Sequence, residues 1–349
     1  MFFHSYFKNI IMEVTRLIYP KDEVIYMFAV SSLKKDCLQT IFWFSELYYS
    51  GFQYDALYAI YFTYFNFYSL QQPYLIDYIY NHIDSWSKDD NIEHFMFIIF
   101  KFQLCKYNFD TFYLFHQNSN TITKSFSFCK GRIPKRFSHL SKIQYNIVKS
   151  IEGKNINNVL YFIQNHYDIT KEMFYNNFHF HSYAPKAAQY LELLSNIILS
   201  FGNNPVNDHE LLKNDVDITF ENQPYMGILN MDFTNCKSYK ILKNYSLYGI
   251  DPIIGIFDLQ RNNIEDLRDL YMYKWETFFH KSPFWKENVE KYEGSFDDNN
   301  MPCFKNTDHE EDFNNTYYLE FDEQPLDVQN KYLININSVS FDDFSNYFI

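Results

Sequence analysis

The sequence predicts a mainly α-helical protein built as an irregular, solenoid-like array of stacked α-helical hairpins. Three observations support this fold class. Glycine and proline are scarce, at 8 and 10 of 349 residues, whereas a β architecture with many turns needs more of both. Apolar residues recur at helical spacing over long stretches of the chain. The expected helices begin near residues 21, 36, 53, 73 and 91, a spacing typical of stacked helix pairs, although no repeated sequence motif accompanies it.

The first expected helix begins after Pro20, a residue that suits the first turn because it has no amide hydrogen. Asp22 and Glu23 follow in the same turn, where carboxylates favour the helix dipole. We expect this helix to end near Lys34.

Residues 36–70 are predicted to form two helices joined at Gly51, since glycine tolerates the left-handed backbone found at helix ends. Apolar side chains cover more than half of the first of these helices, so we expect an inner helix covered on two sides. Each buried aromatic side chain contributes roughly 2–3 kcal/mol, which makes this pair the expected centre of the core. The remaining polar stripe of the first helix is expected to comprise Asp36, Gln39, Glu46 and Ser50.

Two more helices are expected in the N-terminal half, one starting at Pro73 and one near residue 91. The second half is expected to be helical with minor β or irregular structure. Residues 206–260 alternate only weakly in hydrophobicity and are expected to hold a strand or two. The helices expected in the second half are Val148–His166, Pro185–Phe201 and Ile264–Phe279.

Composition divides the chain into four parts. They are an N-terminal helical-hairpin array (1–116), a basic connecting loop (117–142), a second helical part with minor β structure (143–289) and an acidic, partly exposed C-terminal region (290–349). The last part holds 14 acidic and 3 basic residues, in a chain whose net charge is −13. Within it, residues 297–315 are expected to be exposed and mobile, and residues 324–349 to pack against the rest of the protein.

Several functional classes lack their sequence motifs. The five cysteines are scattered and form no CxxC pair, so neither a disulfide framework nor a cysteine zinc site is predicted. No glycine falls in a phosphate-binding or dinucleotide-binding loop, and no nucleophile elbow is present. No run of ~18 apolar residues predicts a membrane span. We therefore expect a soluble protein that is not an enzyme and has no catalytic residues and no cofactor.

Two histidines, His179 and His181, alternate with phenylalanines. On an extended segment both imidazoles would point the same way and could present two nitrogens to a metal ion. A third ligand would have to come from elsewhere in the fold, so we favour a packed or surface pair and expect no metal. The acid pairs Asp297/Asp298 and Asp342/Asp343 are likewise expected to be solvated charge rather than catalytic carboxylates.

The basic loop is the best functional candidate in the sequence. Residues 111–151 contain seven Lys or Arg and no acidic residue. Basic and aromatic side chains are interleaved there, so phosphate pairing and base stacking are both available. The candidate nucleic-acid contacts are Lys124, Phe126, Phe128, Lys130, Arg132, Lys135 and Arg136. Two alternatives stay open, a solvated loop and a loop whose charge is matched by the acidic C-terminal region.

Six segments spread over the chain carry a family resemblance. They are Tyr19–Val24, Phe42–Phe52, Tyr248–Asp251, Ser282–Lys286, Asp322–Pro325 and Val328–Lys331. These segments resemble a family of uncharacterised proteins of giant nucleocytoplasmic large DNA viruses of the mimivirus kind. The resemblance implies a viral protein located in the host cytoplasm, at the virus factory, or in the virion. It brings no catalytic or binding residues to this chain.

The function expected from these observations is that of a helical interaction or assembly protein with protein partners, because helical hairpin arrays offer extended surfaces. The alternative is a nucleic-acid-binding protein that acts through residues 124–142.

Overall fold

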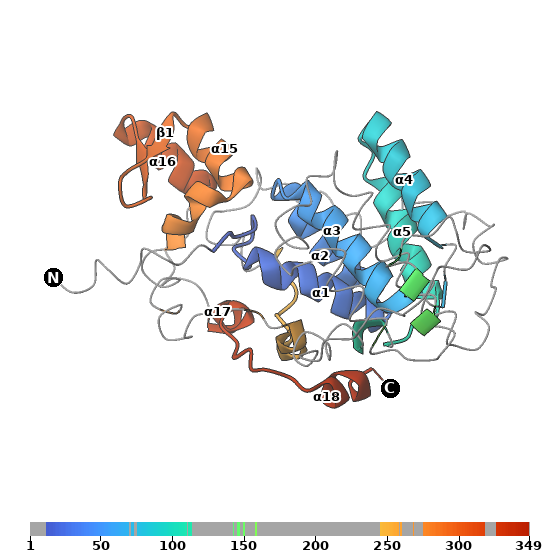
Figure 1. Cartoon of the computed structure of the whole chain (residues 1–349). Helices are drawn as coiled ribbons and strands as arrows, with labels where there is room; N and C mark the ends of the chain where they lie inside the picture. Colours follow the sequence, from blue (N-terminus) through green and yellow to red (C-terminus); the bar gives the residue numbers. More distant parts are fainter. Residues whose placement is uncertain are drawn as a thin grey trace. The chain divides into compact units, whose positions relative to one another are not determined.

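The computed structural model describes residues 12–69, 71–72, 75–109, 111–113, 142, 145–146, 149–150, 158, 245–257, 259, 268, 275–317 and 326–348. Helices dominate these residues, and their strands form one two-stranded sheet (Figure 1). The predicted mainly helical fold is confirmed, while the solenoid-like stacking of hairpins stays a prediction. None of the helices within the described ranges is long and apolar enough to span a bilayer.

The chain divides into two compact units. The first combines Met1–Ile60 with Asp215–Ile349, and the second comprises Tyr61–Asn214. The first unit is therefore assembled from segments far apart in sequence. The four-part division drawn from composition remains a prediction beside it.

Helix α1, Lys21–Leu33, is the central helix of the first unit. It begins directly after Pro20, as predicted, and every residue from Glu23 to Leu33 is buried. A helix that is buried all round must be covered on every side. Helix α2 (Cys37–Tyr49) and the 3-10 helix η6 (Pro252–Phe257) both pack against α1.

Helix α2 starts and ends where the sequence predicts. Asp36 caps its start, since the Asp36 carboxylate accepts a hydrogen bond of 3.0 Å from the backbone N–H of Gln39. Gly51 follows its end with φ of 82°, the left-handed conformation expected there. Helix α3 (Gln53–Thr63) comes next and continues into the π-helix η2, Tyr64–Tyr68.

The predicted polar stripe of α2 is buried at Glu46 and does not face solvent there. The side chain of Glu46 is fully buried and its Oε2 lies 3.3 Å from Nε of Arg16, while its Oε1 accepts a hydrogen bond of 2.9 Å from the amide of Leu17. Ser50 is buried as well and accepts a hydrogen bond of 2.7 Å from the amide of Arg16. These bonds hold a tight turn in which Ile18 has φ of 68°, a strained value for a β-branched residue.

The second unit contains a helix pair and an aromatic cluster among its described residues. Helices α4 (Leu75–Asp89) and α5 (Glu93–Leu104) pack against each other and match the two helices expected there. Tyr68 of η2 stacks on Phe102 of α5 with ring centroids 4.7 Å apart, and its hydroxyl donates a hydrogen bond of 3.0 Å to the Phe102 carbonyl. This contact joins the end of η2 to α5.

The acidic C-terminal region is more ordered than the sequence suggests. Residues 297–315, expected to be mobile, lie in a hairpin and a helix. The strands β1 and β2 pair antiparallel, with Ser295 opposite Cys303. Phe313, 1% exposed, packs on Phe304 with centroids 4.9 Å apart. The elements of this part are η7 (Trp275–Lys281), α15 (Pro283–Lys291), β1 (Gly294–Phe296), β2 (Pro302–Phe304) and α16 (Thr307–Thr316).

The last described residues pack back onto the first unit, in agreement with the expectation for residues 324–349. In helix α17 (Leu326–Tyr332), Tyr332 lies 4.7 Å from Tyr19, measured between ring centroids. In helix α18 (Phe341–Asn346), Phe344 meets Phe257 of η6 edge-on at 5.8 Å. The expected helix Ile264–Phe279 is described only in part, and its residues from Trp275 onward are 3-10 rather than α-helical.

Candidate functional site

A groove about 680 Å³ in volume lies in the first unit, beside η6 and α18. A volume of this size falls within the roughly 300–1,000 Å³ of small-molecule sites. We call it the Asp251 groove. Its lining residues are Gly249, Ile250, Asp251, Pro252, Ile253, Asn335, Asn337, Ser338, Val339, Asp343 and Tyr347.

Local sequence explains how the walls of the groove come together. The Asp251 carboxylate caps the start of η6 by accepting a hydrogen bond of 3.0 Å from the Ile253 amide. Gly255 in η6 permits the close approach of the chain on the opposite wall, since a Cβ at this position would lie 1.8 Å from the carbonyl oxygen of Asn337. The sequence GIDPIIGIF therefore sets both the cap and the spacing of the walls.

An ion pair with an attached phenol includes two lining residues of the groove, Asp251 and Tyr347. Nζ of Lys34 lies 2.6 Å from Oδ2 of Asp251 and 4.7 Å from the ring centre of Tyr347. The Tyr347 hydroxyl donates a hydrogen bond to the same carboxylate oxygen. Burial raises the pKa of Asp251, but the hydrogen bonds from Lys34, Tyr347 and the Ile253 amide outweigh it and hold that pKa below its ordinary value.

The lining of the groove combines apolar and polar side chains. Ile250, Ile253 and Val339 supply apolar surface, and Asn335 and Asn337 supply amides at the rim. Histidine, cysteine and lysine do not occur among the described residues that line the groove. Asp343 also accepts the hydroxyl hydrogen of Ser340 at 2.6 Å.

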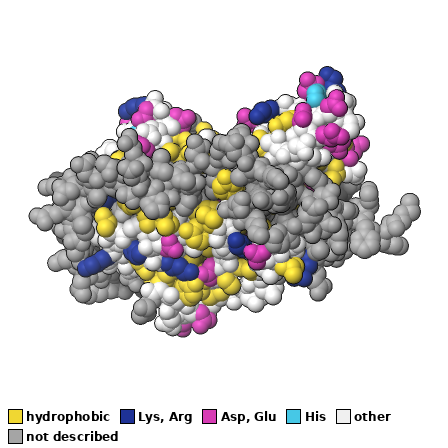
Figure 2. Space-filling model, turned by 180° about the vertical axis from the view of Figure 1, so that it is seen from behind, with side chains coloured by type: hydrophobic (Ala, Val, Ile, Leu, Met, Phe, Trp, Pro, Cys, Tyr) yellow, Lys and Arg dark blue, Asp and Glu magenta, His cyan; other side chains and the backbone are white. Residues whose placement is uncertain are grey.

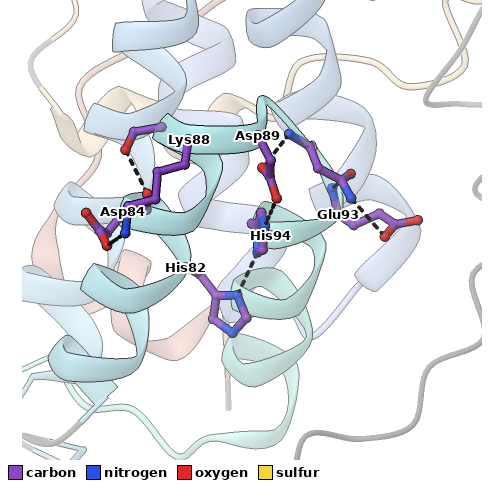
Figure 3. Close-up of polar contacts among 8 residues, drawn as sticks. His82, Asp84, Lys88, Asp89, Glu93 and His94 are labelled. Carbon is purple, nitrogen blue, oxygen red and sulfur yellow. Dashed lines mark hydrogen bonds and ion pairs between the residues drawn. The ribbon is translucent and has the colours of Figure 1, made fainter.

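A second polar cluster lies in the second unit, at the turn between α4 and α5 (Figure 3). Nδ1 of His82 on α4 is 3.2 Å from Nδ1 of His94 on α5. Nε2 of His94 is in turn 2.9 Å from Oδ2 of Asp89, the last residue of α4. We call these three residues the His82–His94–Asp89 array.

The turn and the surrounding rings fix this array. Asp90 has φ of 53°, and the Asn91 amide donates a hydrogen bond of 2.9 Å to Oδ1 of Asp89. His82 stacks on Phe97 at 5.2 Å and lies 4.4 Å from Tyr78, measured between ring centres. The hydrogen bond with His94, followed by that from the Asn91 backbone, lowers the pKa of Asp89. A cluster of three or more metal-ligating side chains does not occur in the described part of the chain.

A third feature is an acidic surface on the part made of α15, β1, β2 and α16. Figure 2 shows Asp and Glu side chains gathering there around one histidine. Glu293 on this surface pairs with Lys305 at 2.8 Å, and both side chains are mostly exposed. Such exposed pairs contribute little to stability.

The candidate residues from the sequence fall partly outside the described residues. The candidate residues of the basic loop, and the pair His179 and His181, lie outside the described residues, so both hypotheses stay predictions. The acid pairs are described. Oδ1 of Asp297 accepts hydrogen bonds of 2.8 Å from the Asn299 and Met301 amides in the β1–β2 turn. The Asp343 amide donates to the Ser340 hydroxyl that caps α18. At least one member of each pair thus has a structural role.

Sequence reasoning missed both the Asp251 groove and the His82–His94–Asp89 array. His82 and His94 are twelve positions apart and belong to two helices, so no short motif contains them. The signal that could have found them is the short turn at residues 90–92, which brings the end of one helix beside the start of the next.

Comparison of the chain with protein-family models, with curated proteins and with solved structures gives no match. The resemblance to giant-virus proteins therefore stays a prediction from the sequence.

Proposed function

We propose that this protein is a non-enzymatic interaction protein whose Asp251 groove binds an extended segment of a protein partner. The observation that carries the proposal is the lining of the groove, in which apolar side chains lie beside rim amides and a carboxylate. An extended peptide can place an apolar side chain against Ile250 and Val339 and bond its backbone to Asn337.

The charge around the groove indicates a basic side chain in the bound segment. Lys34 is engaged by Asp251. Asp342 and Asp343 lie together at the start of α18 and are both exposed. A lysine or arginine of the partner can pair with these carboxylates, and such rim charges govern the rate of association and the choice of partner more than the affinity.

Site-specific photocrosslinking tests this proposal. A photoreactive side chain at exposed Asn337 is expected to capture a partner segment that contains apolar and basic residues, from the native source treated with nuclease. The same group at exposed Asn315 on α16 is the control. The variant Asn337→Arg is expected to abolish capture by a probe at Ser338, because it obstructs the groove and repels a basic side chain. Equal capture by this variant and by Asn315→Arg would contradict the proposal.

The setting that we propose, a virus factory or virion, rests on the family resemblance alone.

The second candidate function is nucleic-acid binding through residues 124–142. Its support is the run of seven basic residues and no acid over residues 111–151. It predicts binding to single-stranded DNA or RNA that weakens steeply as salt rises, and loss of binding in Lys135→Glu with Arg136→Glu. No binding at low salt would exclude it.

A further inference from the structure

We propose that His82 and His94 form a site for a divalent transition metal ion such as Zn²⁺, with Asp89 as the residue that orients His94. This site is independent of the Asp251 groove and of the interaction function proposed for it. It also differs from the His179 and His181 pair considered from the sequence.

The distance between the two ring nitrogens fits a metal ion. Nδ1 of His82 and Nδ1 of His94 are 3.2 Å apart. In a tetrahedral Zn²⁺ site each nitrogen ligand lies 2.0–2.1 Å from the metal. Two such nitrogens are then about 3.3–3.4 Å apart. The two helices therefore already hold the nitrogens at the separation that coordination requires.

The third member of the array supplies the support that metal-binding histidines normally have. Oδ2 of Asp89 accepts a hydrogen bond from Nε2 of His94 at 2.9 Å (Figure 3). With its proton on Nε2, His94 presents the lone pair of Nδ1 toward His82. A carboxylate that binds the far nitrogen of a ligating imidazole fixes its tautomer and raises its basicity.

Binding requires only a small adjustment of the rings. In the present geometry the two Nδ1 atoms face each other, as they do when a single proton lies between them. Coordination of one metal ion by both nitrogens requires each ring to turn the direction of its Nδ1 lone pair by roughly 35°. Rotation of χ2 supplies this change, since that torsion is broad in histidine. When a metal ion binds, His82 takes the tautomer that carries its proton on Nε2.

The surroundings favour a weak, open site rather than a closed structural one. His94 is 19% exposed, so solvent reaches the array. Since no third ligating side chain joins the pair among the described residues, the remaining coordination positions fall to water or to an added ligand. The aromatic rings of Tyr78 and Phe97 restrict His82 and keep its ring close to His94.

Equilibrium dialysis of the chelator-stripped full chain against Zn²⁺ tests the site. We expect His82→Gln and His94→Gln each to remove one equivalent of bound Zn²⁺ per chain. Asp89→Asn keeps both ligands and is expected to weaken that equivalent about 10- to 100-fold. Asp84→Asn is the matched control, because Asp84 lies on the same helix, is exposed and pairs with Lys88.

Two further readouts separate this site from other interpretations. Co²⁺ in place of Zn²⁺ is expected to give the absorption of a tetrahedral ion in the wild type and in Asp84→Asn, but not in His94→Gln. The double variant His179→Gln with His181→Gln is expected to leave both signals unchanged. Equal Zn²⁺ uptake by the wild type, His82→Gln and His94→Gln, or no uptake by the wild type, would show that the two rings share only a proton. Circular dichroism confirms that each variant is folded.

Discussion

Glu46 and Arg16 form an ion pair inside the first unit, with 0% and 4% of their side chains exposed. Removal of one partner of a buried pair leaves the other charge without compensation and costs roughly 3–5 kcal/mol. Glu46 also binds the amide of Leu17. We therefore expect Glu46→Ala to lower the free energy of unfolding by about 3–5 kcal/mol, measured by urea denaturation.

The matched control for this prediction is Glu310→Ala, because Glu310 is an exposed residue of α16. It is expected to change the free energy of unfolding by less than about 0.5 kcal/mol. The double replacement Arg16→Met with Glu46→Leu is expected to recover part of the loss, since it removes both charges. A Glu46→Ala protein as stable as the control would contradict the burial of this pair.

The ionisation of Asp251 makes the free energy of unfolding depend on pH in the acidic range. Burial raises the pKa of Asp251, yet the hydrogen bonds from Lys34 and Tyr347 outweigh this effect and hold that pKa below its ordinary value. A carboxyl whose pKa is lower in the folded state binds protons more readily when unfolded. Its contribution to stability is therefore complete above the unfolded pKa and is lost as the pH falls through the lower, folded pKa.

Comparison of the wild type with Asp251→Asn measures this contribution. The variant keeps an oxygen for the Ile253 amide but loses the charge that pairs with Lys34. We expect the wild type to be more stable by roughly 1.5–3 kcal/mol near neutral pH. The difference in the free energy of unfolding should stay constant down to about pH 5 and shrink below about pH 4. A difference that instead grows with acid would contradict the lowered pKa.

At the level of single residues, polarity in the sequence does not reveal burial. Glu46 has helical neighbours of mixed polarity and is indistinguishable from a residue on a solvated stripe. Its burial follows from Arg16 and the Leu17 amide, which lie 30 and 29 positions away and reach it only through the fold. His82 and His94 present the same problem, because each looks like an isolated histidine until the turn is formed.

At the level of elements, Gly255 and Gly249 form a natural pair for a test of the Asp251 groove. A Cβ at Gly255 would lie 1.8 Å from the Asn337 carbonyl oxygen, whereas among the described residues a Cβ at Gly249 would lie nearest to Lys331, at 3.8 Å. We expect Gly255→Ala to push residues 335–339 away from η6. It should lower the free energy of unfolding by about 1–3 kcal/mol, as overpacking does.

The same substitution tests the proposed binding. Gly255→Ala is expected to abolish photocrosslinking from Asn337, while Asn315→Ala on α16 is expected to leave it unchanged. Gly249→Ala, the control for stability, is expected to leave the free energy of unfolding close to that of the wild type. Thermal unfolding and the crosslinking yield check the two effects separately. If Gly255→Ala lowers stability but keeps full crosslinking, the wall formed by residues 335–339 is not part of the binding site.

Local chemistry decided which elements could be predicted from the sequence. Pro20, Asp36 and Gly51 act within their own helix ends, and the helices there begin and end as expected. The β1–β2 hairpin and α16 could not be predicted in this way. Their segment is acidic, so it has the composition of a mobile region. It is ordered by a few apolar anchors such as Phe313, whose partners the composition does not show.

At the level of the whole molecule, the division into two units predicts which helices a destabilising substitution opens. Tyr68 and Phe102 belong to the second unit, whereas Glu46 and Arg16 belong to the first. Each unit has its own buried contacts, and opening of local regions follows such cooperative units. The boundary between residues 60 and 61 falls inside α3, so this helix contributes to both.

Hydrogen exchange of two variants measures this division. We expect Glu46→Ala to raise amide exchange in α1, α2 and η6, because α2 carries Glu46 and both α2 and η6 pack against α1. Phe102→Ala leaves a cavity beside Tyr68 and is expected to cost about 3–5 kcal/mol, with the rise in exchange confined to η2, α5 and the last residues of α3. Residues 61–63 at the end of α3 should respond only to Phe102→Ala. If either variant raises exchange in all of these helices to the same degree, the chain opens as one cooperative body and the division into two units does not govern its stability.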